Sequence, residues 1–319
     1  MHIERSNTSN ASILEHLTCR DGRLPTTLDY KQVEKFTLGE RMAGSFPLVV
    51  PDSFMIIAHR GASGYSADQT AESFLRAKAL GAGHVEIDAQ VAADGVVVLC
   101  HDEHLKHYGY EGEIKALSYE DVLSRCDMGV WRGFGRQEQN MLCLEDLFLR
   151  HGRDFVFHIE LKSNQPELPE AVIDLVRKHG LRDQVVLTSQ WINLLDAARK
   201  IDESLPRAFL CRYLDQAMLE QAKNVGCSQV CPRADLLSPE IVGIVKDNGM
   251  DVRAWGVSWL SDDPAVTLWR TSRVIQSGCV GTTINEPDFL IHARVAARQK
   301  HEIWPVTLDM YPSGKTMSA

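Results

Sequence analysis

From residue 55 onward, short apolar runs alternate with segments of helical periodicity. Many of the runs are apolar on both faces, which is typical of parallel strands covered by helices. The repeat of a strand followed by a helix predicts an α/β fold. Nine runs have the length and composition of strands: 55–58, 84–88, 96–100, 155–160, 185–188, 208–211, 229–231, 252–257 and 280–283.

Capping signals place helices between these runs. Thr70 is a good N-cap for a helix over 71–80, and Gly81 follows that helix as a stop signal. Ser238 is followed by proline, which is a strong start signal for a helix over 239–248. The strands and helices therefore alternate along the chain, as parallel crossover units require.

The length of 319 residues suits an eight-stranded (β/α) barrel of the TIM type, which we expect to carry an N-terminal arm. A doubly wound open sheet is the alternative. Nine strands are one too many for a simple barrel. Asp94 and Gly95 form a tight-turn signal, so the runs 84–88 and 96–100 are predicted to form a hairpin.

The two ends of the chain lack this rhythm. We expect residues 1–53 to form an N-terminal arm that packs on the barrel or on a neighbouring molecule. Residues 54–300 would then form the catalytic barrel domain. The segment 301–319 contains two prolines and a glycine and is expected to be a C-terminal tail.

Charge and hydropathy narrow the function classes. Lys and Arg number 34 against 43 Asp and Glu, giving a net charge of −9 without a basic cluster, so nucleic acid is excluded as a partner. An acidic protein still binds an anionic substrate where cations gather in one pocket. No signal peptide and no membrane span is expected, which predicts a cytoplasmic protein. Nothing in the sequence fixes the oligomeric state.

Carboxylates end two of the predicted strands. Glu86 and Asp88 lie two apart and so face the same way. They would repel each other unless a cation intervenes, and Mg²⁺ and Ca²⁺ prefer oxygen ligands. Glu160 and Lys162 end another run, and strand ends meet at one face of a barrel. Glu160 is therefore expected to complete a metal site, with Lys162 on the phosphoryl oxygens; the alternative is a surface ion pair.

Two histidines, His59 and His101, also follow apolar runs. Cleavage of a phosphodiester needs a base for the attacking oxygen and an acid for the leaving alkoxide, and two imidazoles suit that division. Arg60 offers a fork of donors that matches phosphate oxygens. Trp255 ends a strand and is expected either to line the substrate pocket or to pack in the core.

Two further observations concern histidine. His101, His104 and His107 form the pattern H-x-x-H-x-x-H, which is open to interpretation as a transition-metal cluster or as an ordinary loop. His84 and His158 lie within strand-like runs and are expected to fill the barrel rather than to act in catalysis.

Taken together, these residues resemble the glycerophosphodiester phosphodiesterases over roughly residues 55–290. The resemblance rests on the following segments: His59-Arg60-Gly61, Glu86-Ile87-Asp88, His101-Asp102, Glu160-Leu161-Lys162 and Pro287-Asp288. It implies a TIM-type barrel and one divalent cation, Mg²⁺ or Ca²⁺ or else Mn²⁺. By the same resemblance Glu86, Asp88 and Glu160 would be the metal ligands. His59 and His101 would be general acid and base, and Arg60 and Lys162 would contact the phosphate.

The chain departs from the family pattern in one loop of particular interest. Residues 67–70 are Ala-Asp-Gln-Thr where the family usually has Pro-Glu-Asn-Thr. The proposed catalytic set is intact, so we expect hydrolysis of glycerophosphodiesters or a related small phosphodiester to an alcohol and a phosphomonoester. The alternatives are a phospholipase D-like enzyme that acts on lysophospholipids or sphingolipids and releases a cyclic phosphate, and a non-catalytic phosphodiester-binding relative.

Overall fold

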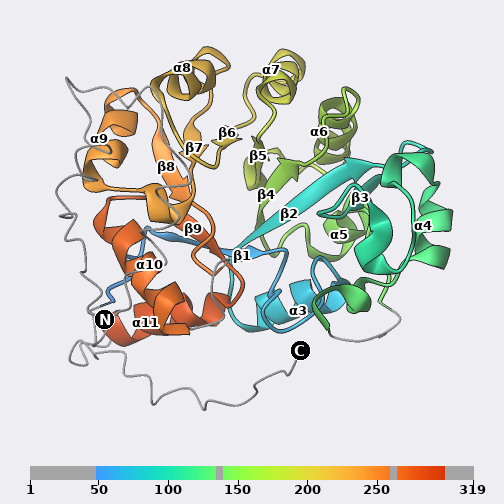
Figure 1. The fold of residues 1–319 in the computed structure, drawn as a ribbon, viewed down its shortest axis with the longest axis horizontal. Coiled ribbons are helices and arrows are strands. Elements are labelled where there is room, and N and C mark those ends of the chain that lie inside the picture. The colour runs from blue at the N-terminus through green and yellow to red at the C-terminus, as the bar shows by residue number, and fades with distance from the viewer. Residues whose placement is uncertain (1–47, 134–138, 259–263, 299–319) are drawn as a thin grey trace, which may run out of the picture.

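The computed structural model describes residues 48–133, 139–258 and 264–298. Within them, eight parallel strands form a closed barrel with helices on all sides (Figure 1). Closure is complete because β1 pairs in parallel with both β2 and β9. The TIM-type barrel is confirmed and the open sheet is excluded. In spatial order the strands are β1 (Met55–His59), β2 (His84–Val91), β4 (Val156–Leu161), β5 (Val185–Ser189), β6 (Arg207–Leu210), β7 (Gln229–Cys231), β8 (Asp251–Ala254) and β9 (Gly281–Ile284).

The helices begin where the sequence signals place them. Thr70 Oγ1 accepts a hydrogen bond from the Ser73 N–H (3.3 Å), and Ser238 Oγ accepts one from the Ile241 N–H (3.3 Å), as N-caps do. Both predicted helices are confirmed. The helices are α3 (Ala71–Ala79), α4 (Tyr119–Arg125), α5 (Leu144–His151), α6 (Leu168–Lys178), α7 (Ile192–Ile201), α8 (Gln216–Asn224), α9 (Pro239–Asp247), α10 (Pro264–Gln276) and α11 (Pro287–Arg298).

The ninth strand, β3 (Val97–Leu99), lies outside the barrel. It pairs antiparallel with β2 through a tight turn in which the Gly95 N–H donates to the Ala92 carbonyl (2.9 Å). Gly95 has a φ of 84°, a conformation that glycine adopts without steric cost. The predicted hairpin is therefore confirmed.

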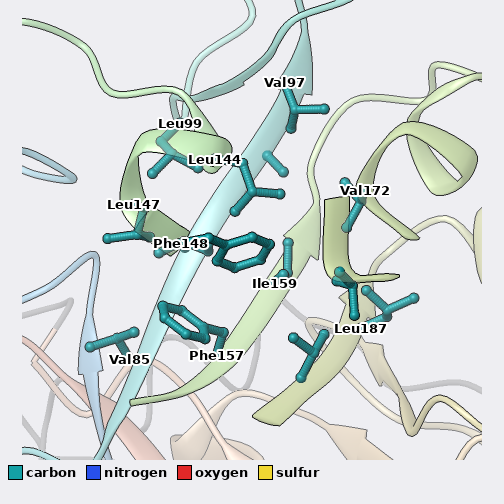
Figure 2. Packing of buried hydrophobic residues seen from close by; sticks show 14 of the residues in the cluster. Val85, Val97, Leu99, Leu144, Leu147, Phe148, Phe157, Ile159, Val172 and Leu187 are labelled. Atoms are coloured by element: carbon teal, nitrogen blue, oxygen red, sulfur yellow. The ribbon is translucent and has the colours of Figure 1, made fainter. Parts of the chain in front are cut away.

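The barrel has a hydrophobic layer between its strands and its helices. On one side, α5 lies over β2 and β4, and Figure 2 shows Phe148 of α5 close to Phe157 of β4. Their ring centroids are 5.2 Å apart at 69°, an edge-to-face contact. Burial of each phenylalanine contributes ~1.5–3 kcal/mol. A second cluster joins β6–β9 to α8–α10 and includes Leu48 and Val50, which precede β1.

The chain makes a long detour between β3 and α5, which we call the β3–α5 excursion (residues 100–143). Its described part has a small hydrophobic cluster of its own, in which Leu105, Tyr108, Ile114 and Met141 are at most 1% exposed. The excursion begins directly after β3, so it carries His101 at its first turn. A structured segment with its own core therefore presents this histidine.

The predicted domain boundaries are only partly within the described residues. Residues 1–47 of the expected arm and the whole expected tail, 301–319, lie outside them. Leu48 and Val50 do pack on the barrel. In the part of the chain that the structure describes, every helix is too short or too polar to cross a bilayer.

Candidate active site

The carboxyl ends of the first barrel strands bring the predicted residues together. His59 is in register with Glu86 across β1 and β2, and Asp88 is in register with Glu160 across β2 and β4. Ligand oxygens of Glu86, Asp88 and Glu160 all lie within 4.8 Å of one another, and all three residues are buried. Parallel strands in a barrel impose this convergence, because their carboxyl ends share one rim.

The surroundings of the three carboxyl groups shift their pKa values in different directions. Burial raises the pKa of Glu86 well above its ordinary value, and repulsion from Asp88 and Glu160 adds to the effect. Burial likewise raises the pKa of Glu160. Burial opposes ionisation of Asp88 too, but Lys162 and Arg60 outweigh it and hold the pKa of Asp88 below its ordinary range. Asp88 is therefore the carboxylate that the protein itself keeps charged.

Two cations lie against these carboxylates. Lys162 Nζ is 3.1 Å from Asp88 Oδ1 and 3.1 Å from Glu160 Oε1. Arg60 Nε is 2.9 Å from Asp88 Oδ2, and Arg60 Nη1 donates to Asp68 Oδ2 at 2.7 Å. Burial works against both charges, but the neighbouring carboxylates raise the pKa of Arg60 and of Lys162.

The donor set fits one hard divalent cation. Arg60 and Lys162 supply two fixed positive charges beside the three carboxyl groups Glu86, Asp88 and Glu160, so ionisation of all three leaves one buried negative charge uncompensated. Glu86 Oε2 is buried and accepts no hydrogen bond, and an unsatisfied buried carboxylate oxygen is costly. Oxygen-only ligands at this spacing suit Mg²⁺ or Ca²⁺.

Both predicted catalytic histidines are held through Nδ1. His59 Nδ1 is 2.8 Å from Asn285 Oδ1, and His59 Nε2 is 3.7 Å from Glu86 Oε2. His101 Nδ1 is 2.7 Å from Asp102 Oδ1. Because an oxygen accepts at each Nδ1, the proton of the neutral ring resides there and the lone pair lies on Nε2. The side chains are 26% and 33% exposed, so a substrate has access to them.

The hypothesis of a transition-metal cluster at His101, His104 and His107 is wrong. His107 Nδ1 binds the second oxygen of Asp102 at 2.7 Å, and His104 pairs with Glu113 at 3.5 Å. His101 and His107 thus share the Asp102 carboxylate while His104 pairs with Glu113, and among the described residues the three imidazoles do not form a group that could hold one ion. Burial opposes ionisation of Asp102, but its bonds to His101 and His107 outweigh burial and lower the pKa of Asp102 to about 2. Asp102 therefore supports His101 as a carboxylate at neutral pH.

A cleft of about 590 Å³ opens beside this site. It shares His101 and Lys162 with the site, so a group attached to a phosphate at the carboxylates would extend into it. Trp255 is half-buried after β8, and its Nε1 donates to the Cys211 carbonyl at 2.9 Å. Trp255 is not among the described residues that line the cleft, which are His101, Asp102, Glu103, His104, Lys106, His107, Lys162 and Gln190.

Sequence reasoning missed the residues that hold the predicted ones in place. Asn285 orients His59 from a position 226 residues away. Gln69 binds Asp88, and Asp68 binds Arg60. Asn285 directly follows β9, so the strand-end argument used for His59 would have found it. Gln69 lies in a loop, where no such periodic signal exists.

The barrel interior below the site contains a second polar layer. His158 is fully buried, and its Nε2 is 3.3 Å from His84 Nδ1. Burial lowers the pKa of His158 well below its ordinary value, and Arg253 adds to the effect. The pKa of His84 is lowered by the same two causes. His158 therefore fills the barrel as expected, whereas His84, at the first position of β2, is only half-buried.

This chain is similar to known phosphodiesterases. The chain is 27% identical to a glycerophosphodiester phosphodiesterase of Caldanaerobacter subterraneus over 75% of this chain and 96% of the relative. It is 26% identical to a mouse lysophospholipase D over 58% of each chain. An Oleispira antarctica phosphodiesterase, solved with the product sn-glycerol-3-phosphate, has the same fold, with a TM-score of 0.66 and 22% sequence identity. The match covers 75% of this chain and 96% of that one.

The model of the glycerophosphoryl diester phosphodiesterase family matches residues 59–288, a span that contains every candidate site residue. The resemblance noted in the sequence is thereby confirmed. The chain is a phosphodiesterase and belongs to the glycerophosphoryl diester phosphodiesterase family.

Proposed function

We propose that this enzyme hydrolyses glycerophosphodiesters, or a related small phosphodiester, to an alcohol and a phosphomonoester. One observation carries the proposal: three buried carboxylates converge within 4.8 Å, beside two imidazoles whose Nδ1 atoms are each held by an oxygen. This is the combination that phosphodiester cleavage needs, since it supplies a cation site together with an acid and a base.

Each side chain has a distinct part in this proposal. Glu86, Asp88 and Glu160 would hold one divalent cation, Mg²⁺ or Ca²⁺ or else Mn²⁺, which when bound supplies a Lewis acid for the phosphoryl group. His59 and His101 act as the acid–base pair through Nε2, each contributing ~10²–10⁴-fold to the rate.

The remaining groups position the diester. Arg60 and Lys162 contact the phosphoryl oxygens, whose negative charge their fixed positive charges stabilise. The cleft, which is lined by His101 and Lys162 among others, holds the alcohol group of the diester. Trp255 would bind the glycerol-like part from the opposite side of the rim.

The relative named lysophospholipase D motivates a second candidate substrate, a lysophospholipid, with release of a cyclic phosphate. To distinguish the two candidate substrates, metal-stripped protein is assayed with a panel of phosphodiesters. Glycerophosphodiesters with several alcohol groups are compared with lysophospholipids, with and without Mg²⁺, Ca²⁺ or Mn²⁺, and products are followed by phosphorus NMR.

We expect metal-dependent conversion of at least one glycerophosphodiester to a phosphomonoester. A cyclic phosphate as the end product would replace this proposal with the second candidate. Full turnover in excess chelator would contradict the metal site itself.

A further inference from the structure

Gln69 occupies an unusual place directly behind the candidate metal site. It lies between β1 and α3, is 0% exposed, and has a φ of 57°. Residues other than glycine, asparagine and aspartate rarely adopt this left-handed conformation. The backbone is fixed by a hydrogen bond from the Gln69 N–H to the Arg60 carbonyl at 2.9 Å. The loop therefore holds a buried glutamine in a conformation that glutamine itself does not favour.

Both polar atoms of the Gln69 amide group form hydrogen bonds with Asp88. Its Oε1 accepts a hydrogen bond from the Asp88 N–H at 2.7 Å, and its Nε2 donates to Asp88 Oδ2 at 3.1 Å. Arg60 Nε lies 2.9 Å from the same Oδ2. Gln69 therefore donates a hydrogen bond to this oxygen, and Arg60 forms an ion pair with it. Asp88 Oδ1 accepts no hydrogen bond and lies on the side of Lys162, at 3.1 Å.

We propose that Gln69 is a positioning residue, which fixes the Asp88 side chain so that Oδ1 is presented to the divalent cation. This inference rests on the proposed function, because it requires that Asp88 is a metal ligand. A carboxylate that is oriented before the ion arrives loses less conformational freedom on binding. The αL backbone is then explained, since it aims the amide at both the main chain and the side chain of Asp88.

Side-chain length is the testable part of this geometry. Asparagine, which the family pattern has at this position, adopts the left-handed conformation readily and is one methylene shorter, so Gln69→Asn keeps the loop and shortens the reach of the amide to Asp88. Gln69→Met keeps the length and removes both hydrogen bonds.

Gln90 provides a matched control. It is also a buried glutamine next to Asp88 on β2, at 2% exposure. Its Nε2 donates to the Cys100 carbonyl at 2.8 Å and the Asp102 carbonyl at 3.1 Å, and not to the carboxylate cluster.

The experiment measures Mn²⁺ binding by calorimetry on the metal-stripped full-length chain. We expect Gln69→Asn and Gln69→Met to bind Mn²⁺ about 10- to 100-fold more weakly than the wild type, as loss of a group behind a metal ligand does. Gln90→Met should bind Mn²⁺ as the wild type does. Thermal unfolding of the metal-free variants reports whether they fold, and saturating Mn²⁺ should restore turnover to Gln69→Asn.

The outcomes separate this inference from the proposed function. If the wild type binds Mn²⁺, Glu86→Gln abolishes binding, and both Gln69 variants bind normally, the positioning role is wrong and the metal site stands. An equal loss of Mn²⁺ affinity in Gln90→Met would also overturn the positioning role, because a general loosening of β2 would then explain the weaker binding. If the wild type binds no Mn²⁺, the metal site and the positioning role fail together. Should Gln69→Met unfold, Gln69→Asn decides alone.

Discussion

Two layers of ionisable side chains are buried inside the same barrel, two residues apart along the same strands. The upper layer contains the carboxylates Glu86, Asp88 and Glu160; the lower contains the imidazoles His84 and His158. Glu86 is in direct register with His158 across β2 and β4. His158 is buried as deeply as the three carboxylates, whereas His84 is half-buried. For His158, the surroundings rather than the depth of burial make the difference.

The protein treats the two layers in opposite ways. In the upper layer, Arg60 and Lys162 lie against the carboxylates and hold Asp88 charged against the effect of burial. In the lower layer, burial and the positive charge of Arg253 lower the pKa of both imidazoles and favour their neutral form. Burial of a polar group does not by itself identify a reactive site. The useful marker is a set of like charges brought together with an incomplete complement of counter-charges.

The largest effect is expected from Glu160→Gln in the upper layer. Loss of a ligand removes the Lewis acid, worth several kcal/mol, so kcat/KM should fall by about 10³-fold or more. The metal-free protein should unfold at the same or a higher temperature, because one of three repelling carboxyl groups is gone. Steady-state kinetics and thermal unfolding in chelator check both statements. Wild-type turnover with lowered stability would show that the upper layer is only structural.

The next effect concerns the histidines at the rim. His59→Ala and His101→Ala should each reduce kcat by ~10²–10⁴-fold, as loss of a general acid or base does. Divalent-cation affinity, measured by calorimetry, should be unchanged, which distinguishes them from the carboxylates. His179→Ala is the control, since His179 pairs with Glu145 at the end of α6, away from the site. Loss of cation binding in His59→Ala would make that histidine a ligand instead.

Asn285→Ala should have an intermediate effect. Without Asn285 Oδ1 the ring of His59 is no longer fixed, and outer groups of this kind contribute about 10- to 100-fold. Asn285→Asp retains an acceptor for His59 Nδ1 and should recover most of the lost kcat. If the two variants are equally impaired, the role of Asn285 is not to orient the imidazole.

The smallest effect is expected in the lower layer, from His158→Leu. The variant loses a hydrogen bond to His84, which is worth ~1 kcal/mol in the free energy of unfolding. Turnover should be close to that of the wild type. Denaturant unfolding and an activity assay test this, and a large fall in kcat with an unchanged fold would mean that the two layers work together.

The alternation of strands and helices predicted the barrel. The strand-end argument then predicted that the candidate residues meet at one rim, because parallel strands align their carboxyl ends. The structure brings His59, Glu86 and Glu160 to one rim: His59 ends β1, Glu160 lies near the end of β4, and Glu86 is in register with His59 although β2 continues to Val91. The strand-end argument failed for Gln69, whose contact with Asp88 depends on a left-handed backbone that no periodicity encodes. Asn285 directly follows β9, so the same argument extends to it, but its partner His59 lies 226 residues earlier and no local pattern links the two residues. Local patterns therefore find the groups that do chemistry more readily than the groups that hold them.

The β3–α5 excursion is a part of this enzyme in which the sequence is able to diverge separately from the barrel. His101 sits at the start of a segment with its own hydrophobic cluster, whereas the carboxylates belong to barrel strands. Insertions or exchanges within that segment can reshape the wall around the substrate's alcohol group without repacking the barrel. One scaffold is thereby free to diversify its choice of alcohol while the machinery that breaks the phosphate bond stays the same.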